Sequence, residues 1–138
     1  MTGVVLDASA TLPWCFGDEL TPDGRALLQR VGSSFAAVPA IWPLEVGNIL
    51  AAAERKGRIT AADIAEFVPL LDRLDIRPDG ATAERGLKEI LELARRESLS
   101  SYDAAYLDLA MREGLPLATR DEALADAARR CGVEVIAA

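Results

Sequence analysis

The stretch VVLDASA, residues 4–10, decides the fold prediction for this chain. Its apolar run Val4-Val5-Leu6 is typical of a buried strand, and the run ends abruptly at the carboxylate of Asp7. In open parallel sheets, ligands bind outside the carboxyl ends of the strands. Asp7 is therefore a candidate functional residue, and its significance depends on whether other acids occupy similar positions.

Short apolar segments alternate with helical segments along the rest of the chain. Further strands are predicted at 35–38, near 76, at 117–118 and at 133–136. Helices are predicted at 25–31, 43–56, 60–74, 82–96, 101–112 and 122–130. This alternation predicts one α/β domain over residues 1–138, with a mainly parallel sheet flanked by helices.

Three local predictions accompany these elements. The segment GDELTPDG, residues 17–24, is expected to be a loop, because it contains the breakers Pro22 and Gly24. Pro69 lies inside the 60–74 helix and is expected to kink or break it. The 82–96 helix is expected to carry an apolar stripe made of Leu87, Ile90, Leu91 and Ala94.

The composition excludes several kinds of catalyst. The chain of 138 residues contains no histidine, which excludes Ser-His-Asp and Cys-His catalysis and the usual zinc enzymes. Its two cysteines, Cys15 and Cys131, are too few for a disulfide framework and are expected to be buried as small hydrophobes. The net charge of −7 argues against a general nucleic-acid binder, unless much of it is gathered in one site and neutralised by a divalent cation.

The sequence also lacks the patterns of membrane insertion and export. No apolar run approaches the length needed to cross a bilayer, and the N-terminus has no basic start followed by a long apolar stretch. We therefore expect a cytoplasmic protein without a membrane partner.

Three further acids occupy positions comparable with that of Asp7. Asp121 follows the predicted strand at 117–118, while Asp103 and Glu45 lie near the starts of helices on largely apolar faces. An ordinary structural explanation exists for each of them, because the helix dipole favours acids in a first turn. Capping boxes are a further explanation, since both Thr119-x-x-Glu122 and Ser100-x-x-Asp103 have the required spacing.

Two neighbours of these acids receive predictions of their own. Asn48 lies one helical turn after Glu45 and is expected to hold the Glu45 side chain or a nearby ligand. Asp108 lies five residues after Asp103 and points away from its face, so it is expected to be an ordinary solvated acid.

A parallel α/β sandwich brings strand ends and the starts of the following helices to one rim of the sheet. Four carboxylates gathered there would repel one another, and some would be forced to take up a proton. A divalent cation removes this conflict, and ligands that are all oxygens select a hard ion, Mg²⁺ or Mn²⁺. Such a site predicts phosphodiester hydrolysis by a metal-activated water that a free carboxylate orients or deprotonates.

Four segments taken together resemble one protein family. They are VVLDASA (4–10), PLEVGNIL (43–50), LSSYDAAYLDLA (99–110) and LATRDEALADAARRCGVEVI (117–136). In this order they are similar to PIN-domain ribonucleases of the VapC toxin type, and the resemblance covers nearly the whole chain. It implies a PIN-like three-layer sandwich, Mg²⁺- or Mn²⁺-dependent cleavage of RNA, a cognate antitoxin protein that blocks the site, and a homodimer.

The resemblance also implies roles for individual residues. The catalytic acidic quartet would be Asp7, Glu45, Asp103 and Asp121. The direct metal ligands among them would be Asp7, Asp103 and Asp121, with Glu45 binding metal through water or acting as the base. Supporting polar positions are matched by Thr119, Asn48 and Ser9. Arg120, beside Asp121, is a candidate contact for RNA phosphates.

Three alternatives remain open at this point. A phosphatase of the haloacid-dehalogenase type also places an Asp after its first strand, but it needs a second Asp where this chain has Ser9. A receiver domain needs an acidic pair after the first strand and a late lysine, and neither is evident. A catalytically silent PIN-like binding or scaffold module is the third alternative, against which the four intact acids count.

Overall fold

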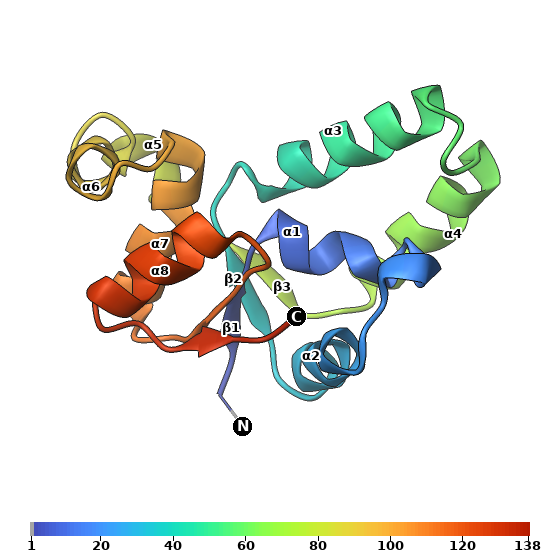
Figure 1. Ribbon diagram of the computed structural model, residues 1–138, viewed down its shortest axis with the longest axis horizontal. Helices are drawn as coiled ribbons and strands as arrows, with labels where there is room; N and C mark the ends of the chain where they lie inside the picture. The colour runs from blue at the N-terminus through green and yellow to red at the C-terminus, as the bar shows by residue number, and fades with distance from the viewer. Residues whose placement is uncertain (1) are drawn as a thin grey trace.

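A five-stranded sheet of order β3-β2-β1-β4-β5 runs through the centre of the protein, in a computed structural model that describes residues 2–138 (Figure 1). All four strand pairings are parallel. The strands are β1 Val4–Leu6, β2 Ala36–Val38, β3 Ile76–Pro78, β4 Leu117–Ala118 and β5 Val135–Ile136. Because β1 lies between β2 and β4, the chain winds outward from it in both directions, and a ligand crevice is expected at its carboxyl end.

Helices cover both faces of this sheet, as the sequence predicts (Figure 1). Helices α1 and α2 lie on one side, and α7 and α8 on the other. The helical elements are α1 Ala8–Thr11, α2 Pro22–Ser33, α3 Trp42–Arg55, α4 Ala61–Asp72, α5 Thr82–Arg85, α6 Glu89–Glu97, α7 Ser101–Glu113 and α8 Glu122–Arg130, with 3₁₀ turns at Leu12–Trp14 and Gly17–Glu19. The predicted α/β sandwich with a parallel sheet is therefore confirmed.

Helix α7 is the central helix of the core. Every residue from Ala104 to Ala110 is buried, and the helix contacts β1, β2 and β4. Its start is fixed by Ser100, whose hydroxyl accepts a hydrogen bond from the Asp103 N–H at 3.0 Å. Its end is fixed by Gly114, which adopts a left-handed φ of 65° that costs glycine little. The helix leads directly into β4, so its first turn lies at the carboxyl end of the sheet.

Two boundary predictions are wrong for reasons of local chemistry. Residues 22–24 are not loop, because Thr21 accepts a hydrogen bond from the Gly24 N–H and Pro22 occupies the first position of α2. Helix α4 runs through Pro69 without a break, so the predicted break is wrong and a kink stays a prediction. Pro69 has no N–H to donate to the carbonyl group of Ala65. That carbonyl lies on an exposed face, where a water molecule can donate the missing hydrogen bond.

The predicted helix at 82–96 is two helices, and its predicted apolar stripe is wrong in part. The chain leaves the helical conformation between α5 and α6, where Lys88 has φ −119° and ψ −108°. Leu87, which lies in this break, is 87% exposed, and Leu91 is 38% exposed. The buried side chains of α6 are instead Ile90, Leu93 and Ala94.

The two cysteines are only partly buried. Cys15 and Cys131 are free and half-buried, so the prediction that they are buried hydrophobes holds only in part. Among residues 2–138, every helix is too short or too polar to span a membrane.

Candidate functional site

Asp7 is a buried carboxylate at the carboxyl end of the central strand. Its side chain is placed directly after β1, and the residue is 5% exposed. Two hydroxyl groups donate to its Oδ2 atom, Ser9 Oγ at 2.8 Å and Thr119 Oγ1 at 2.7 Å. Burial raises the pKa of Asp7 and the charge of Asp121 adds to this, whereas the two hydrogen bonds lower it.

The same two hydroxyls also fix the turn that carries Asp121. Thr119 Oγ1 accepts a hydrogen bond from the Asp121 N–H at 3.0 Å, and Ser9 Oγ accepts one from the Arg120 N–H at 2.9 Å. The end of β1 is thereby tied to the turn between β4 and α8. The Thr119 hydroxyl thus donates its proton to Asp7 and accepts a hydrogen bond from the Asp121 N–H.

Asp121 is the N-cap of α8, a role that the capping-box prediction gave to Thr119. The Oδ1 atom of Asp121 accepts a hydrogen bond from the Leu124 N–H at 3.0 Å. This leaves Oδ2 of Asp121 for other contacts. A helix-start role for Asp121 is therefore confirmed, but the alternative capping box of Thr119 with Glu122 is not formed, because Asp121 is the cap and the Thr119 hydroxyl donates to Asp7.

The pKa of Asp103 is raised in part by the charges of the other three acids. Asp103 lies half-buried in the first turn of α7, where Ser100 caps the helix through the Asp103 backbone. Burial raises the pKa of Asp103 to about 6, and the negative charges of Asp7, Asp121 and Glu45 add to the effect. The four acids predicted from the sequence are therefore brought within electrostatic reach of one another.

Glu45 lies in the first turn of α3 and is held by a residue that the sequence analysis did not select. The Tyr106 hydroxyl donates to Glu45 Oε1 at 2.6 Å. Burial raises the pKa of Glu45, the Tyr106 hydrogen bond lowers it, and the charge of Asp7 raises it. Asn48 is exposed and makes no side-chain hydrogen bond within residues 2–138, so the part of its prediction that concerns Glu45 is wrong, while a contact with a nearby ligand stays a prediction.

The topology explains why these acids meet. Asp7 directly follows β1 and Asp121 follows β4, while α3 follows β2 and starts near the end of that strand. Helix α7 runs back toward the start of β4, so its first turn with Asp103 lies at the same rim. Parallel strands put all their carboxyl ends on one edge, and the four acids are placed there.

The acids offer only oxygen donors, which suit a hard divalent cation. The buried Asp7 carboxylate and the raised pKa values of Asp7, Glu45 and Asp103 identify a cluster whose negative charge is poorly compensated by the protein. Within residues 2–138, no three Asp, Glu, Cys or His side chains already enclose a single point as a metal cage does.

Asp108 is not the solvated acid that the sequence predicts. It is 6% exposed and receives two hydrogen bonds from Arg85, at 2.8 and 2.9 Å, and one from Arg112 at 3.1 Å. Burial alone would raise its pKa, but the two guanidinium groups hold the pKa of Asp108 below its usual value. Arg112 also pairs with Asp79, so the network joins α7 to α5 and to the end of β3.

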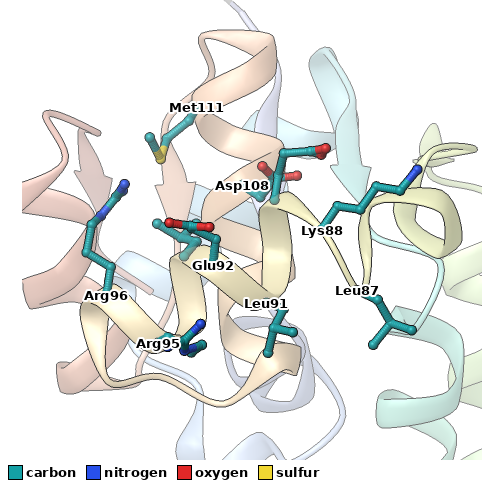
Figure 2. A pocket seen from close by; sticks show the side chains of 10 residues that line it. Leu87, Lys88, Leu91, Glu92, Arg95, Arg96, Asp108 and Met111 are labelled. Carbon is teal, nitrogen blue, oxygen red and sulfur yellow. The ribbon is translucent and has the colours of Figure 1, made fainter.

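A groove of about 650 Å³ lies between α6 and α7, and none of the four predicted acids lines it (Figure 2). Its walls combine the apolar side chains of Leu87, Leu91 and Met111 with the charged side chains of Lys88, Glu92, Arg95 and Arg96. The acidic cluster and this groove are therefore separate features. Arg120, the predicted phosphate contact, is exposed beside Asp121.

Comparisons with known proteins agree with this architecture. The family model of the PIN domain matches residues 4–130. Comparison with curated protein sequences gives no match.

Solved structures that are similar to this chain come from several organisms. PAE2754 from Pyrobaculum aerophilum is 24% identical, with 97% of this chain and 83% of that chain covered and a TM-score of 0.72. VapBC2 from Rickettsia felis bound to a DNA fragment from their promoter is 14% identical, with coverages of 100% and 99% and a TM-score of 0.69. FitAcB from Neisseria gonorrhoeae is 19% identical, with coverages of 99% and 96% and a TM-score of 0.49. With the family model matching nearly the whole length, the chain belongs to the PIN domain family.

Proposed function

We propose that this protein is a divalent-metal-dependent endoribonuclease that acts as the toxin of a toxin–antitoxin pair. The observation that carries the proposal is the cluster of Asp7, Glu45, Asp103 and Asp121, in which burial and mutual repulsion raise the pKa of Asp103 to about 6. Membership of the PIN domain family supports a nuclease. In a catalytically silent scaffold, the repulsion among four clustered carboxylates would destabilise the fold without supporting any activity.

Mg²⁺ or Mn²⁺ is the proposed cofactor, with Asp7, Asp103 and Asp121 as its ligands. The bound metal would lower the pKa of a coordinated water and screen the phosphodiester. Ser9 and Thr119 hold the Asp7 carboxylate through Oδ2, which fixes its direction toward the cluster. Glu45 is anchored through Oε1 by the Tyr106 hydroxyl, and we assign it the task of orienting or deprotonating the attacking water.

RNA is the proposed substrate, and Arg120 is the proposed phosphate contact nearest the cluster. It is exposed, and its backbone is fixed by Ser9. The net charge of −7 makes electrostatic attraction of RNA weak before the metal binds. Bound divalent cations would neutralise much of the negative charge at the site while leaving the rest of the surface acidic.

An antitoxin protein and a second copy of the chain are the proposed partners. The solved VapBC2 complex from Rickettsia felis, whose fold this chain shares, supports an antitoxin. Large exposed apolar side chains support association more generally; they include Leu44, Val68, Leu70 and Leu87. A cytoplasmic location fits these partners.

Digestion of single-stranded RNA with Mg²⁺, with Mn²⁺ and with excess EDTA tests the proposal. The expected result is cleavage with either metal, none in EDTA, and none by Asp7→Asn in any condition. Asp126→Asn is the matched control, because Asp126 is an exposed acid whose ion pair is with Arg129 on the same helix. A calorimetric titration with Mn²⁺ accompanies the digest, and absence of both binding and cleavage would favour a scaffold module.

A further inference from the structure

The hydroxyl group of Tyr106 is buried at the centre of the protein beside the acids. Tyr106 lies on α7, three residues after Asp103, and its side chain is fully buried. Its 2.6 Å contact with Glu45 Oε1 falls in the range of charge-assisted O–H···O⁻ bonds, about 2.5–2.7 Å. A buried hydroxyl requires a partner, and the side-chain partner of this one is a member of the acidic cluster.

Tyr106 is a permanent donor in this pair. Burial raises the pKa of Tyr106, and the hydrogen bond to Glu45 together with the charges of Glu45 and Asp7 raises it further. The phenol therefore keeps its proton throughout the physiological range. The direction of the hydrogen bond is fixed, with Tyr106 donating and the Glu45 carboxylate accepting.

The hydrogen bond divides the two oxygens of Glu45 between two tasks. Tyr106 engages Oε1, and within residues 2–138 no other side chain donates to this carboxylate. Oε2 accepts no hydrogen bond from the part of the chain that the structure describes. The bond also connects α3 to α7, so the two helices that carry Glu45 and Asp103 are held in one arrangement.

We propose that Tyr106 is a positioning residue of the acidic site, which anchors Glu45 through Oε1 so that Oε2 remains for the attacking water. This inference rests on the proposed nuclease function. Asp103 and Tyr106 share one face of α7 at a spacing of three residues, so the same helix supplies an acid and aligns another. Tyr106 acts through Glu45 and has no contact with the substrate.

Kinetics of Tyr106→Phe test the inference, because the variant removes one oxygen and keeps the packed ring. We expect kcat for RNA cleavage to fall about tenfold or more, since a misplaced catalytic group is costly, while KM stays unchanged. Tyr102→Phe is the matched control on the same helix. Tyr102 is 61% exposed, and its hydroxyl forms no hydrogen bond with residues 2–138. Its kcat should equal that of the unmodified protein.

A double-mutant cycle separates positioning from general support of the fold. Once Glu45→Ala has removed the acceptor, adding Tyr106→Phe should cause no further loss of kcat. Losses that multiply would overturn the proposal, because Tyr106 would then act independently of Glu45. An unchanged kcat in the single variant would overturn it equally.

Carbon-13 NMR of the metal-free protein gives a measurement that is independent of cleavage. The Glu45 carboxyl resonance should shift in Tyr106→Phe and stay in place in Tyr102→Phe. In the unmodified chain, the same resonance should show an isotope shift on transfer from H₂O to D₂O, which needs no variant to fold. If the unmodified protein binds Mn²⁺ but leaves RNA intact, the proposed function fails, and the NMR result alone decides whether Tyr106 anchors Glu45.

Discussion

Thr119 donates a hydrogen bond to Asp7 across 112 positions of the chain, at 2.7 Å. It accepts a hydrogen bond from the Asp121 N–H at the same oxygen, so one side chain orders two of the four acids. Parallel strands make this arrangement possible, because the residues that follow β1 and β4 emerge side by side.

Thr119→Val should destabilise the protein and reduce cleavage. The substitution preserves shape, but it removes a donor from the buried Asp7 carboxylate and leaves the Asp121 N–H without its acceptor. The expected loss is about 1–3 kcal/mol in the free energy of unfolding, measured by urea denaturation in EDTA. Thr119→Ser keeps the hydroxyl and should retain most of the stability, whereas equal losses in the two variants would show that the methyl group contributes as much as the hydroxyl.

Asp103→Asn should stabilise the metal-free protein while abolishing cleavage. The amide removes a negative charge that burial and three neighbouring acids oppose. Asp103 is half-buried, so solvent screening limits the gain in the free energy of unfolding to about 1 kcal/mol at neutral pH. Urea denaturation in EDTA measures the gain, and a less stable variant would contradict the repulsion inferred here.

The stability of the metal-free protein should fall as the pH rises between about 4 and 7. Asp103 has an ordinary pKa of 3.8 when unfolded and a pKa of about 6 when folded. The folded state therefore binds more protons in this window, and the penalty for ionisation is absent below 3.8 and complete above about 6. Asp7 and Glu45 are shifted in the same direction.

Calorimetric melting temperatures across this pH window, with EDTA and with saturating Mn²⁺, measure the effect. In EDTA the melting temperature should decrease with rising pH. With Mn²⁺ it should increase, because the ionised carboxylates then bind the cation. Parallel curves in the two conditions would mean that the metal does not bind at these acids.

Asp108→Ala should be much more destabilising than Asp126→Ala. Removing Asp108 leaves Arg85 and Arg112 partly buried without their shared acceptor, for an expected cost of about 2–4 kcal/mol. The Asp126 pair with Arg129 is exposed on α8 and contributes less than about 1 kcal/mol. Urea midpoints of the two variants measure the difference, and similar values would remove the structural role assigned to the network.

Local patterns predicted the strands and most helix ends because the relevant chemistry is local. The Gly114 end of α7 and the bounds of α8 follow from residues within one turn. The break between α5 and α6 has Gly86 as its local signal, but a single glycine is tolerated inside a helical pattern. Periodicity alone therefore extended one helix through the break and placed Leu87 in the core.

The candidate site shows the same division between local and distant information. Strand ends and helix starts identified Asp7, Asp121, Asp103 and Glu45 because parallel topology fixes where these points meet. The partners of their oxygens are set by side-chain packing across the sheet, so Asn48 was selected where Tyr106 makes the contact. The three-residue spacing of Asp103 and Tyr106 was the signal that could have identified the tyrosine.

The central position of β1 has a consequence for biosynthesis. Asp7 leaves the ribosome early, whereas its neighbours on β4 and the turn after it are among the last parts of the fold to emerge. A nascent chain that stops before Asp121 lacks one of the four acids however well its first half has folded. Translation must run almost to the end of the domain before the cluster can assemble.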